Sequence, residues 1–459
     1  MRLHAAAALL PQGWAREVAI EIDPAGRIAA ANAGARSEAS AERIAGFVVP
    51  GMPNVHSHAF QRVMAGLAER RTQAGDGFWS WRDLMYRFAS RITPAQMRDV
   101  AAWLYVEMLR AGFTSVAEFH YVHHDVDGRP YADPAETSHR IVDAAHASGI
   151  ALTHLPVLYR HSGFGSKAPL PAQRRFVHST DGYLRLLEAL LRRYGASRDV
   201  RVGLAFHSLR AVDPASIDES LAALARLDPR SPVHIHVSEQ QSEVEDCVAQ
   251  LGRRPVRWLL EHARPDPRWC LVHATHLDED EMRALAASGA VAGLCPTTEA
   301  NLGDGVFPAS GYLAEAAPGR FGIGTDSHVE VSVAAELRML EYSQRLVLHA
   351  RCVLASGRQP STGLRLFVDA AAGGARALGI EAGRIAPGCR ADLAVLDPGH
   401  PALWNKSPEQ AIDAWIFAGG ASCVRDVMVG GEWRIRDRRH AAEDELARGY
   451  HAAQAALLA

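Results

Sequence analysis

Short apolar segments alternate with longer helical segments between about residue 47 and residue 330, and this alternation restricts the fold more than any other feature of the chain. The apolar segments are 47–49, 115–119, 151–158, 202–206, 233–237, 270–273, 290–294 and 321–324. The helical segments include 94–111, 138–148, 180–194, 216–227 and 255–263. Eight strands with helices between them predict an α/β protein built as a (β/α)8 TIM-like barrel. An open doubly wound sheet is the alternative, but no glycine-rich phosphate loop follows the first strand.

The two chain ends differ from the barrel region in their predicted secondary structure. Residues 1–48 read as short strands and turns. After a helical segment at 370–378, a turn and an alternating strand follow within 383–397, and short strands continue up to Ile435. We therefore expect a small β-sandwich-like domain made from both chain ends. Its two parts would be residues 1–48 and 373–459, the second closing with an Ala-rich helix over 442–459, and the barrel would occupy 49–372.

Composition excludes several classes of function. Charged residues make up 22% of the 459 residues and the net charge is −3, which argues against a nucleic-acid or membrane-surface partner. No segment has the apolar length of a transmembrane helix, and the apolar run 5–10 is too short to predict a signal peptide. The six cysteines are scattered without a CxxC pair, so the simplest expectation is a protein of the reducing cytoplasm.

Histidines and acids near four predicted strand ends favour a metal site. His56 and His58 follow the first strand and point to the same side of an extended segment. The fifth strand contains His236, the sixth ends at His273, and Asp326 follows the eighth. For any one of them, an ordinary core or surface group is the alternative, in a chain with 22 histidines. Catalytic groups of such barrels gather at the carboxyl ends of the strands, and three histidines with one carboxylate bind zinc while leaving a position open for water.

The arrangement resembles the amidohydrolase superfamily, in the branch that deaminates amidine-like carbons at a single metal. The resemblance covers nearly the whole chain, including the segment 383–397. The metal ligands that it implies are His56, His58, His236 and Asp326. His234 lies in the same strand and is another candidate ligand. In the family pattern, however, the ligand is the histidine three residues before the glutamate, which is His236 here. Relatives with two metals bridge them by a lysine of strand 4, and residues 202–207 contain none, so we expect one divalent ion, with zinc suggested by the family.

The catalytic residues implied by this resemblance are Glu239, His273 and Asp326. Zinc lowers the pKa of a bound water from about 15.7 to about 7. Asp326 would accept the proton of that water. Glu239 would protonate the substrate nitrogen and then the leaving ammonia, and His273 would polarise the reacting centre. A solvated acid at the start of a helix is the alternative for Glu239, but its fixed spacing from His236 favours catalysis.

Further polar residues near strand ends indicate an anionic substrate. They are Gln61, Arg82, Tyr121, His207 and Arg210. Guanidinium groups bind carboxylates through paired hydrogen bonds, so two arginines among these residues favour an anionic substrate. All but two of the 49 basic residues are arginines, and most of these must be solvated surface charges. Arg210 is favoured over that default by its position at a strand end, whereas spacing alone does not place Arg82.

These segments also resemble the formimidoylglutamate deiminase family. The matching stretches are 56–62, 78–82, 118–121, 207–210 and 295–305. The resemblance implies a hydrolase of linear amidines that converts N-formimidoyl-L-glutamate to N-formyl-L-glutamate and ammonia in L-histidine degradation. It also implies that the five polar residues named above hold the two carboxylates of the substrate. A homodimer would be unsurprising for such a barrel.

Two other functions compete with this interpretation. A deaminase of a heterocycle, such as guanine or an adenosine derivative, would favour stacking and amide-type contacts over paired arginines, and Trp79 and Trp81 leave that alternative open. A non-enzymatic binding protein on a relic barrel is expected to have lost Glu239, His273 or Asp326, and all three are present.

Overall fold

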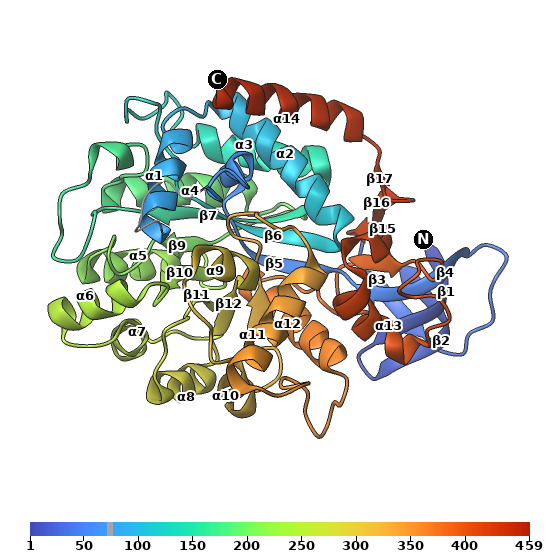
Figure 1. Cartoon of the computed structure of the whole chain (residues 1–459). Coiled ribbons are helices and arrows are strands. Elements are labelled where there is room, and N and C mark those ends of the chain that lie inside the picture. Colours follow the sequence, from blue (N-terminus) through green and yellow to red (C-terminus); the bar gives the residue numbers. More distant parts are fainter. Residues whose placement is uncertain (71–76) are drawn as a thin grey trace.

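The computed structural model describes residues 1–70 and 77–459 and contains the predicted barrel, with a second sheet beside it (Figure 1). The barrel strands are β5 (Met52–Ser57), β6 (Phe113–His120), β7 (Ala151–Leu158), β8 (Val200–Val202), β9 (Leu204–Phe206), β10 (Val233–Val237), β11 (Trp269–His273), β12 (Val291–Leu294) and β13 (Phe321–Ile323). They are parallel in the order β6-β5-β13-β12-β11-β10-β9-β7-β8, and a further pairing of β6 with β7 closes the ring. The predicted fourth strand is divided into β8 and β9 at Gly203. The predicted (β/α)8 barrel is confirmed.

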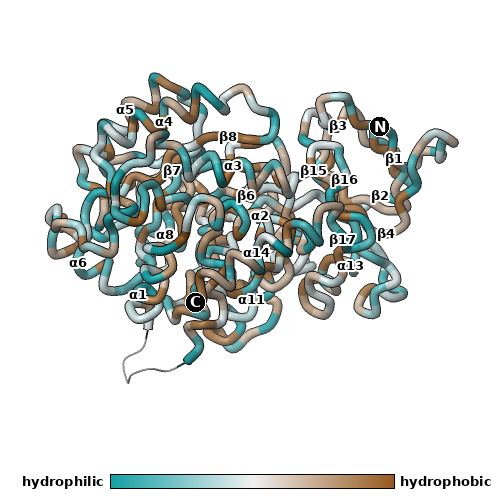
Figure 2. The backbone as a smooth tube through the Cα atoms, turned by 90° about the horizontal axis from the view of Figure 1, so that it is seen from above, coloured by the Kyte–Doolittle hydropathy of each residue, from teal (hydrophilic) through white to brown (hydrophobic). Residues whose placement is uncertain are grey.

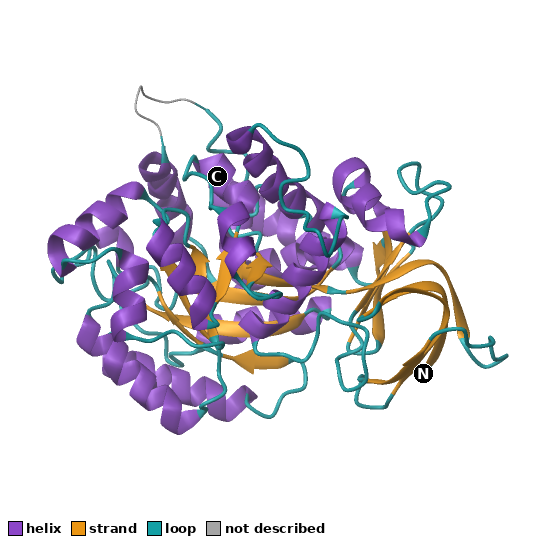
Figure 3. Cartoon of the chain, turned by 90° about the horizontal axis from the view of Figure 1, so that it is seen from below, coloured by secondary structure: helices purple, strands orange, loops and turns teal. Residues whose placement is uncertain are grey.

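Helices cover the outside of the barrel (Figure 3). They are α1 (Phe78–Ala89), α2 (Pro94–Arg110), α3 (Glu136–Ser148), α4 (Thr180–Tyr194), α5 (Pro214–Leu227), α6 (Gln241–Leu251), α7 (Pro255–His262), α8 (Glu279–Ser288), α9 (Pro296–Leu302), α10 (Ala309–Glu315), α11 (Val333–Leu348) and α12 (Thr362–Leu378). Side chains at their starts supply the missing hydrogen-bond acceptors: Thr93 accepts from the Gln96 amide and Asp213 from the Ser216 amide. The starts of the five predicted helices lie within two residues of those observed.

One strand was assigned wrongly. Residues 47–49 were predicted to be the first barrel strand, but they lie in β4 (Glu42–Pro50), which belongs to the second sheet. The first barrel strand is β5, which contains His56. Prolines usually mark the end of a strand because they lack an N–H donor, and β5 contains Pro53. The strand tolerates it with an irregular register against β6.

The second sheet joins the two ends of the chain, as predicted. Its order is β17-β16-β15-β14-β4-β1-β2-β3. Besides β4, the sheet contains β1 (Arg2–Leu10), β2 (Gly13–Ile22), β3 (Ile28–Asn32), β14 (Leu393–Leu396), β15 (Val424–Val429), β16 (Glu432–Arg436) and β17 (Arg439–His440). Figure 2 shows this sheet beside the barrel, and its apolar side chains form a core of their own. The division at 48/49 and 372/373 remains a prediction; β4 and α12 run across these two positions.

The C-terminal helix returns to the barrel. After α13 (Pro408–Ala414) and the strands β15 to β17, α14 (Glu443–Leu458) packs along α2, where the rings of Trp103 and Tyr450 stack with their centroids 6.2 Å apart (Figure 1). Among the described residues, no helix is long and apolar enough to cross a membrane.

Helix α12 lies so close to the barrel that only glycine fits at the contact. A Cβ atom on Gly373 would collide with the carbonyl oxygen of Phe321 in β13. Alanine favours a helix over glycine by about 1 kcal/mol, but an overpacked contact with rigid backbone costs about 3 kcal/mol. We therefore expect Gly373→Ala to lower the free energy of unfolding by about 2 kcal/mol in denaturant titrations. Gly357→Ala, where the methyl group meets open space, is the control, and an equal loss in both variants would contradict the prediction.

Candidate active site

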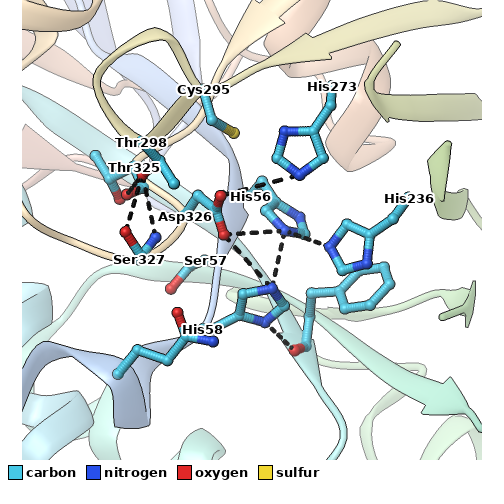
Figure 4. Close-up of polar contacts among 12 residues, drawn as sticks. His56, Ser57, His58, His236, His273, Cys295, Thr298, Thr325, Asp326 and Ser327 are labelled. Atoms are coloured by element: carbon cyan, nitrogen blue, oxygen red, sulfur yellow. Dashed lines mark hydrogen bonds and ion pairs between the residues drawn. The ribbon is translucent and has the colours of Figure 1, made fainter. Parts of the chain in front are cut away.

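The predicted ligands come from three strand ends that face one point inside the barrel (Figure 4). His56 lies in β5 and His58 directly after it, His236 lies in β10, and Asp326 follows β13. All four side chains are buried. The backbone of Asp326 has a φ of 46°, in the left-handed region that non-glycine residues rarely adopt. Strain of this kind persists where surrounding structure imposes it, and it is concentrated at functional sites.

The ligand atoms lie close enough to share one cation. The Nε2 atom of His56 is 3.1 Å from Nε2 of His58 and 2.9 Å from Nε2 of His236. One carboxylate oxygen of Asp326 lies 3.6 Å from Nε2 of His56 and 3.5 Å from Nε2 of His58. Three ring nitrogens that meet at one point cannot all satisfy each other by hydrogen bonds, since each neutral imidazole has a single N–H. His56, His58 and Asp326 form one triad whose atoms are close enough to hold a metal ion, and His56 and His236 belong to a second triad, completed by His273. Imidazole and carboxylate groups of this kind are the ligands of zinc in proteins.

The imidazoles are held in the form that binds metal. Burial lowers the pKa of His58 to about 3 and lowers the pKa of His56 and His236 well below the usual value, so the rings are neutral at pH 7. The Nδ1 atom of His58 lies 2.9 Å from the carbonyl oxygen of Phe119 and donates to it. That hydrogen bond leaves the lone pair of Nε2 free for a metal.

Two further groups, His273 and Glu239, lie beside the ligands and form a cluster with Asp326. Nε2 of His273 lies 3.8 Å from a carboxylate oxygen of Glu239 and 3.9 Å from the second oxygen of Asp326. Burial alone would lower the pKa of His273, but Glu239, Glu299 and Asp326 outweigh it and raise that pKa to about 10. Burial raises the pKa of Asp326 to about 7. The cluster therefore places a protonated donor beside an acid that titrates near neutral pH.

Buried acids that the sequence analysis did not assign support these groups. Glu299, in α9, lies 3.3 Å from Nδ1 of His273 and orients its ring. Glu243, in α6, lies 3.8 Å from Nε of Arg210. Glu118 accepts a 2.5 Å hydrogen bond from Ser57, the residue between the two histidines of β5. Glu243 lies in the first turn of α6, four residues after Glu239, which precedes the helix. The contacts of Glu118, Glu243 and Glu299 depend on tertiary packing, so no local pattern in the sequence indicates them.

The residues predicted to bind substrate line the same pocket. They are Gln61, Arg82, Tyr121, His207 and Arg210. The amide of Gln61 donates to the Tyr121 hydroxyl over 2.9 Å, and the ring of His207 packs 5.2 Å from that of His236. The Nε atoms of Arg82 and Arg210 are buried and, within residues 1–70 and 77–459, have no hydrogen-bond partner. Two arginines that each have a buried Nε–H free to donate make this part of the pocket suitable for an anion.

His234 is separated from the cluster by its depth in the barrel. It lies on the same side of β10 as His236, about 7 Å further down the strand. Its Nε2 atom donates over 2.8 Å to the carbonyl oxygen of Ala377 near the end of α12. The ring therefore fastens α12 to the bottom of the barrel.

Comparison with known proteins agrees with this geometry. The model of the amidohydrolase family matches residues 47–434, and that of the formimidoylglutamate deiminase HutF N-terminal domain matches residues 1–45. A formimidoylglutamate deiminase of Pseudomonas aeruginosa is 54% identical over 98% of this chain and 97% of its own length. The chain belongs to the formimidoylglutamate deiminase family of amidohydrolases. A crystal structure of an amidohydrolase from Brucella melitensis, 47% identical, superposes over 100% of both chains with a TM-score of 0.93.

A heterocycle deaminase is a more distant relative. The 8-oxoguanine deaminase of Pseudomonas aeruginosa is 28% identical over 85% of this chain and 82% of its own length. Membership of the deiminase family makes the protein a metal-dependent hydrolase of C–N bonds, in agreement with the histidine and aspartate cluster at the strand ends.

Proposed function

We propose that this enzyme hydrolyses N-formimidoyl-L-glutamate to N-formyl-L-glutamate and ammonia, the deimination step of L-histidine degradation. The observation that carries the proposal is the pocket itself. Arg82 and Arg210 line the same cavity as the histidine and aspartate cluster, and the buried Nε atom of each has no hydrogen-bond partner among the described residues. A formimidoyl group supplies a C=N carbon for hydrolysis, and the glutamate part supplies two carboxylates for the arginines.

His56, His58, His236 and Asp326 would hold one divalent ion, for which zinc suits the nitrogen-rich donor set. Such an ion supplies Lewis acidity that lowers the pKa of a water molecule from about 15.7 to about 7. A single ion is favoured because strand β9 and the residues next to it carry no lysine that could bridge a second.

The residues of the chain carry the protons. Asp326 takes one proton from the attacking water as oxygen bonds to the formimidoyl carbon. Glu239 delivers its proton to the former C=N nitrogen, then takes the proton of the newly added hydroxyl and passes it to the same nitrogen as the C–N bond breaks, so that ammonia leaves and a formyl oxygen remains. The proton held by Asp326 then returns to Glu239, which restores both groups. His273, 3.8 Å from Glu239, donates a hydrogen bond toward the developing negative charge.

Five side chains would orient the substrate. Arg82 and Arg210 pair with its carboxylates, and the hydroxyl of Tyr121 and the ring of His207 contribute further donors from the opposite wall. Gln61 donates to the Tyr121 hydroxyl over 2.9 Å, which leaves the O–H proton of Tyr121 free to point toward the carboxylate. Arg82 reaches the pocket from α1, where its guanidinium lies 4.2 Å above the ring of Trp79.

The cellular setting is part of the proposal. All six cysteines are free thiols, which suits a reducing cytoplasm. The net charge of −3 suits a small-molecule dicarboxylate substrate better than nucleic acid or a membrane surface. Leu346, Val347 and Leu348, exposed at the end of α11, offer an apolar surface that a second copy would cover in a homodimer.

A steady-state assay with three substrates tests the proposed reaction. N-formimidoyl-L-glutamate, its aspartate homologue and guanine are compared on the purified, metal-loaded enzyme. We expect turnover of formimidoylglutamate with the highest kcat/KM. Release of ammonia from guanine but not from formimidoylglutamate would replace the proposal with the heterocycle deaminase.

Replacing either pocket arginine should weaken substrate binding without removing the metal. A hydrogen-bonded charge pair contributes about 1.5–3 kcal/mol, so we expect Arg82→Met and Arg210→Met each to raise KM by about 10- to 100-fold. Metal analysis of the same preparations should give the wild-type content. Arg87→Met, an exposed arginine on the same helix as Arg82, is the control. Unchanged kinetics in both pocket variants would refute the carboxylate contact.

A further inference from the structure

A buried amide behind the pocket fixes the direction of two hydrogen bonds. Gln173 lies in the short helix η2 (Pro171–Gln173) and is 0% exposed. Its side-chain oxygen accepts a 2.8 Å hydrogen bond from the backbone N–H of Leu170. A backbone N–H can only donate, so this contact determines which end of the amide is oxygen, and the NH2 group must face the other way.

The NH2 group of Gln173 reaches two phenols. Its nitrogen lies 2.8 Å from the hydroxyl of Tyr159 and 3.1 Å from the hydroxyl of Tyr86. The amide donates one hydrogen to each, so both phenol oxygens act as acceptors here. Each O–H proton must then point away from Gln173. Throughout the described chain, neither hydroxyl donates to a protein group other than the second phenol.

Both phenols border the pocket that holds the arginines. Tyr86 is 8% exposed and Tyr159 is 6% exposed, and they share the cavity with Arg82 and Arg210. Burial raises the pKa of Tyr159, so the phenol keeps its proton across the neutral range. One phenol can donate to the other only once, so at least one O–H proton is left for a group in the pocket. An unsatisfied donor in a buried site is costly, which favours an acceptor that arrives with the ligand.

Tyr86 also contacts one of the arginines directly. The guanidinium of Arg82 lies 5.5 Å from the centre of the Tyr86 ring, within the range of a cation–π contact. The ring of Tyr159 packs against His207 with the centroids 4.5 Å apart. The two phenols therefore connect the residues expected to bind substrate, and a proton from either hydroxyl enters a region of positive charge where a carboxylate is the favoured acceptor.

We infer that Tyr86 and Tyr159 determine specificity by donating hydrogen bonds to the substrate carboxylate held by the arginines, and that Gln173 is the positioning residue that aims both hydroxyls into the pocket. The inference rests on the proposed function for the identity of the substrate. The two phenol hydroxyls add neutral donors to the charged donors of the arginines. Together they restrict the position of the carboxylate more narrowly than two flexible arginines can.

Tyrosine-to-phenylalanine variants test the inference through the separation of KM from kcat. We expect Tyr86→Phe and Tyr159→Phe to raise KM for N-formimidoyl-L-glutamate, with a rise of at least tenfold in the double variant and kcat within about threefold of wild type. Gln173→Glu, which turns the donor into an acceptor for both O–H protons, should reproduce the rise in KM. Tyr312→Phe removes a buried hydroxyl that donates to Arg320 outside the pocket, and it should leave KM unchanged. An unchanged KM in the double variant would overturn the inference.

Two truncated substrates identify the contact. The formimidoyl derivatives of 2-aminobutyrate and 4-aminobutyrate each lack one of the two carboxylates. For the derivative that lacks the contacted carboxylate, the double variant and the wild type should have equal kcat/KM, and for the other derivative the difference should persist. An equal loss with both derivatives would overturn the inference, because the hydroxyls would then act on the pocket as a whole.

Binding of glutarate separates this inference from the proposed function. Glutarate is a dicarboxylate without a formimidoyl group, so calorimetry with it requires no turnover. We expect the double variant to bind glutarate at least tenfold more weakly than the wild type. Suppose that the wild type does not hydrolyse formimidoylglutamate but the double variant binds glutarate at least tenfold more weakly than the wild type. The proposed function is then wrong, and the phenol contact is supported. If hydrolysis is observed but the glutarate affinity is the same in both proteins, the phenol contact is wrong and the proposed function is unaffected.

Discussion

Replacing Glu239 by glutamine is expected to lower kcat by about 10³- to 10⁴-fold while the metal content stays at the wild-type level. Glutamine keeps the shape of the side chain but can neither take up nor release a proton at neutral pH. The carboxylate lies 3.8 Å from His273 and 3.9 Å from Arg210, and it is not among the groups that could hold the metal. The loss should therefore appear in single-turnover kinetics with the metal-loaded protein.

Glu243 provides a matched control for this prediction. It is another buried carboxylate on the same side of the pocket, and it lies 3.8 Å from Arg210, the arginine that Glu239 also faces. Glu243→Gln is expected to change KM through Arg210 and to leave most of kcat. Near wild-type turnover in Glu239→Gln, or a larger loss of kcat in Glu243→Gln, would show that the proton shuttle lies elsewhere.

Features that follow from local sequence pattern could be predicted well. The barrel was predictable because short apolar strands alternate with helices, several of which carry their own start signals, such as Thr93 and Asp213. His236 and His273 lie in or at the ends of such strands, so knowing the strands was enough to bring them together.

Other features depend on contacts that local pattern does not contain. The first barrel strand was misplaced because a proline such as Pro53 usually marks the end of a strand. His56 was therefore expected after the first strand, whereas it lies within β5. Glu299 contacts the ring of His273, which is 26 residues away in the sequence. Gln173 contacts the hydroxyl of Tyr159, which is 14 residues away. Their roles emerge only when packing fixes which hydrogen-bonding groups are already satisfied.

Replacing His236 by alanine is expected to remove the metal and nearly all activity. Its Nε2 atom lies 2.9 Å from Nε2 of His56, so the loss of the ring deletes one of the four groups that surround the site. Without the metal, the pKa of water returns from about 7 to about 15.7, and we expect turnover to fall by at least about 10⁴-fold. Metal analysis and ammonia release, measured on the same preparation before and after a chelator, check both parts.

His234 provides a matched control for the prediction on His236. It lies two residues away on the same face of β10, is equally buried, and donates to the carbonyl oxygen of Ala377. His234→Ala should therefore lower the free energy of unfolding by about 1–3 kcal/mol, the cost of an unsatisfied buried acceptor, and retain the metal. The converse pattern, with metal lost in His234→Ala and kept in His236→Ala, would show that the ligand set has been assigned to the wrong depth of the barrel. The two variants thus distinguish a residue that binds metal from one that fastens α12 to the barrel.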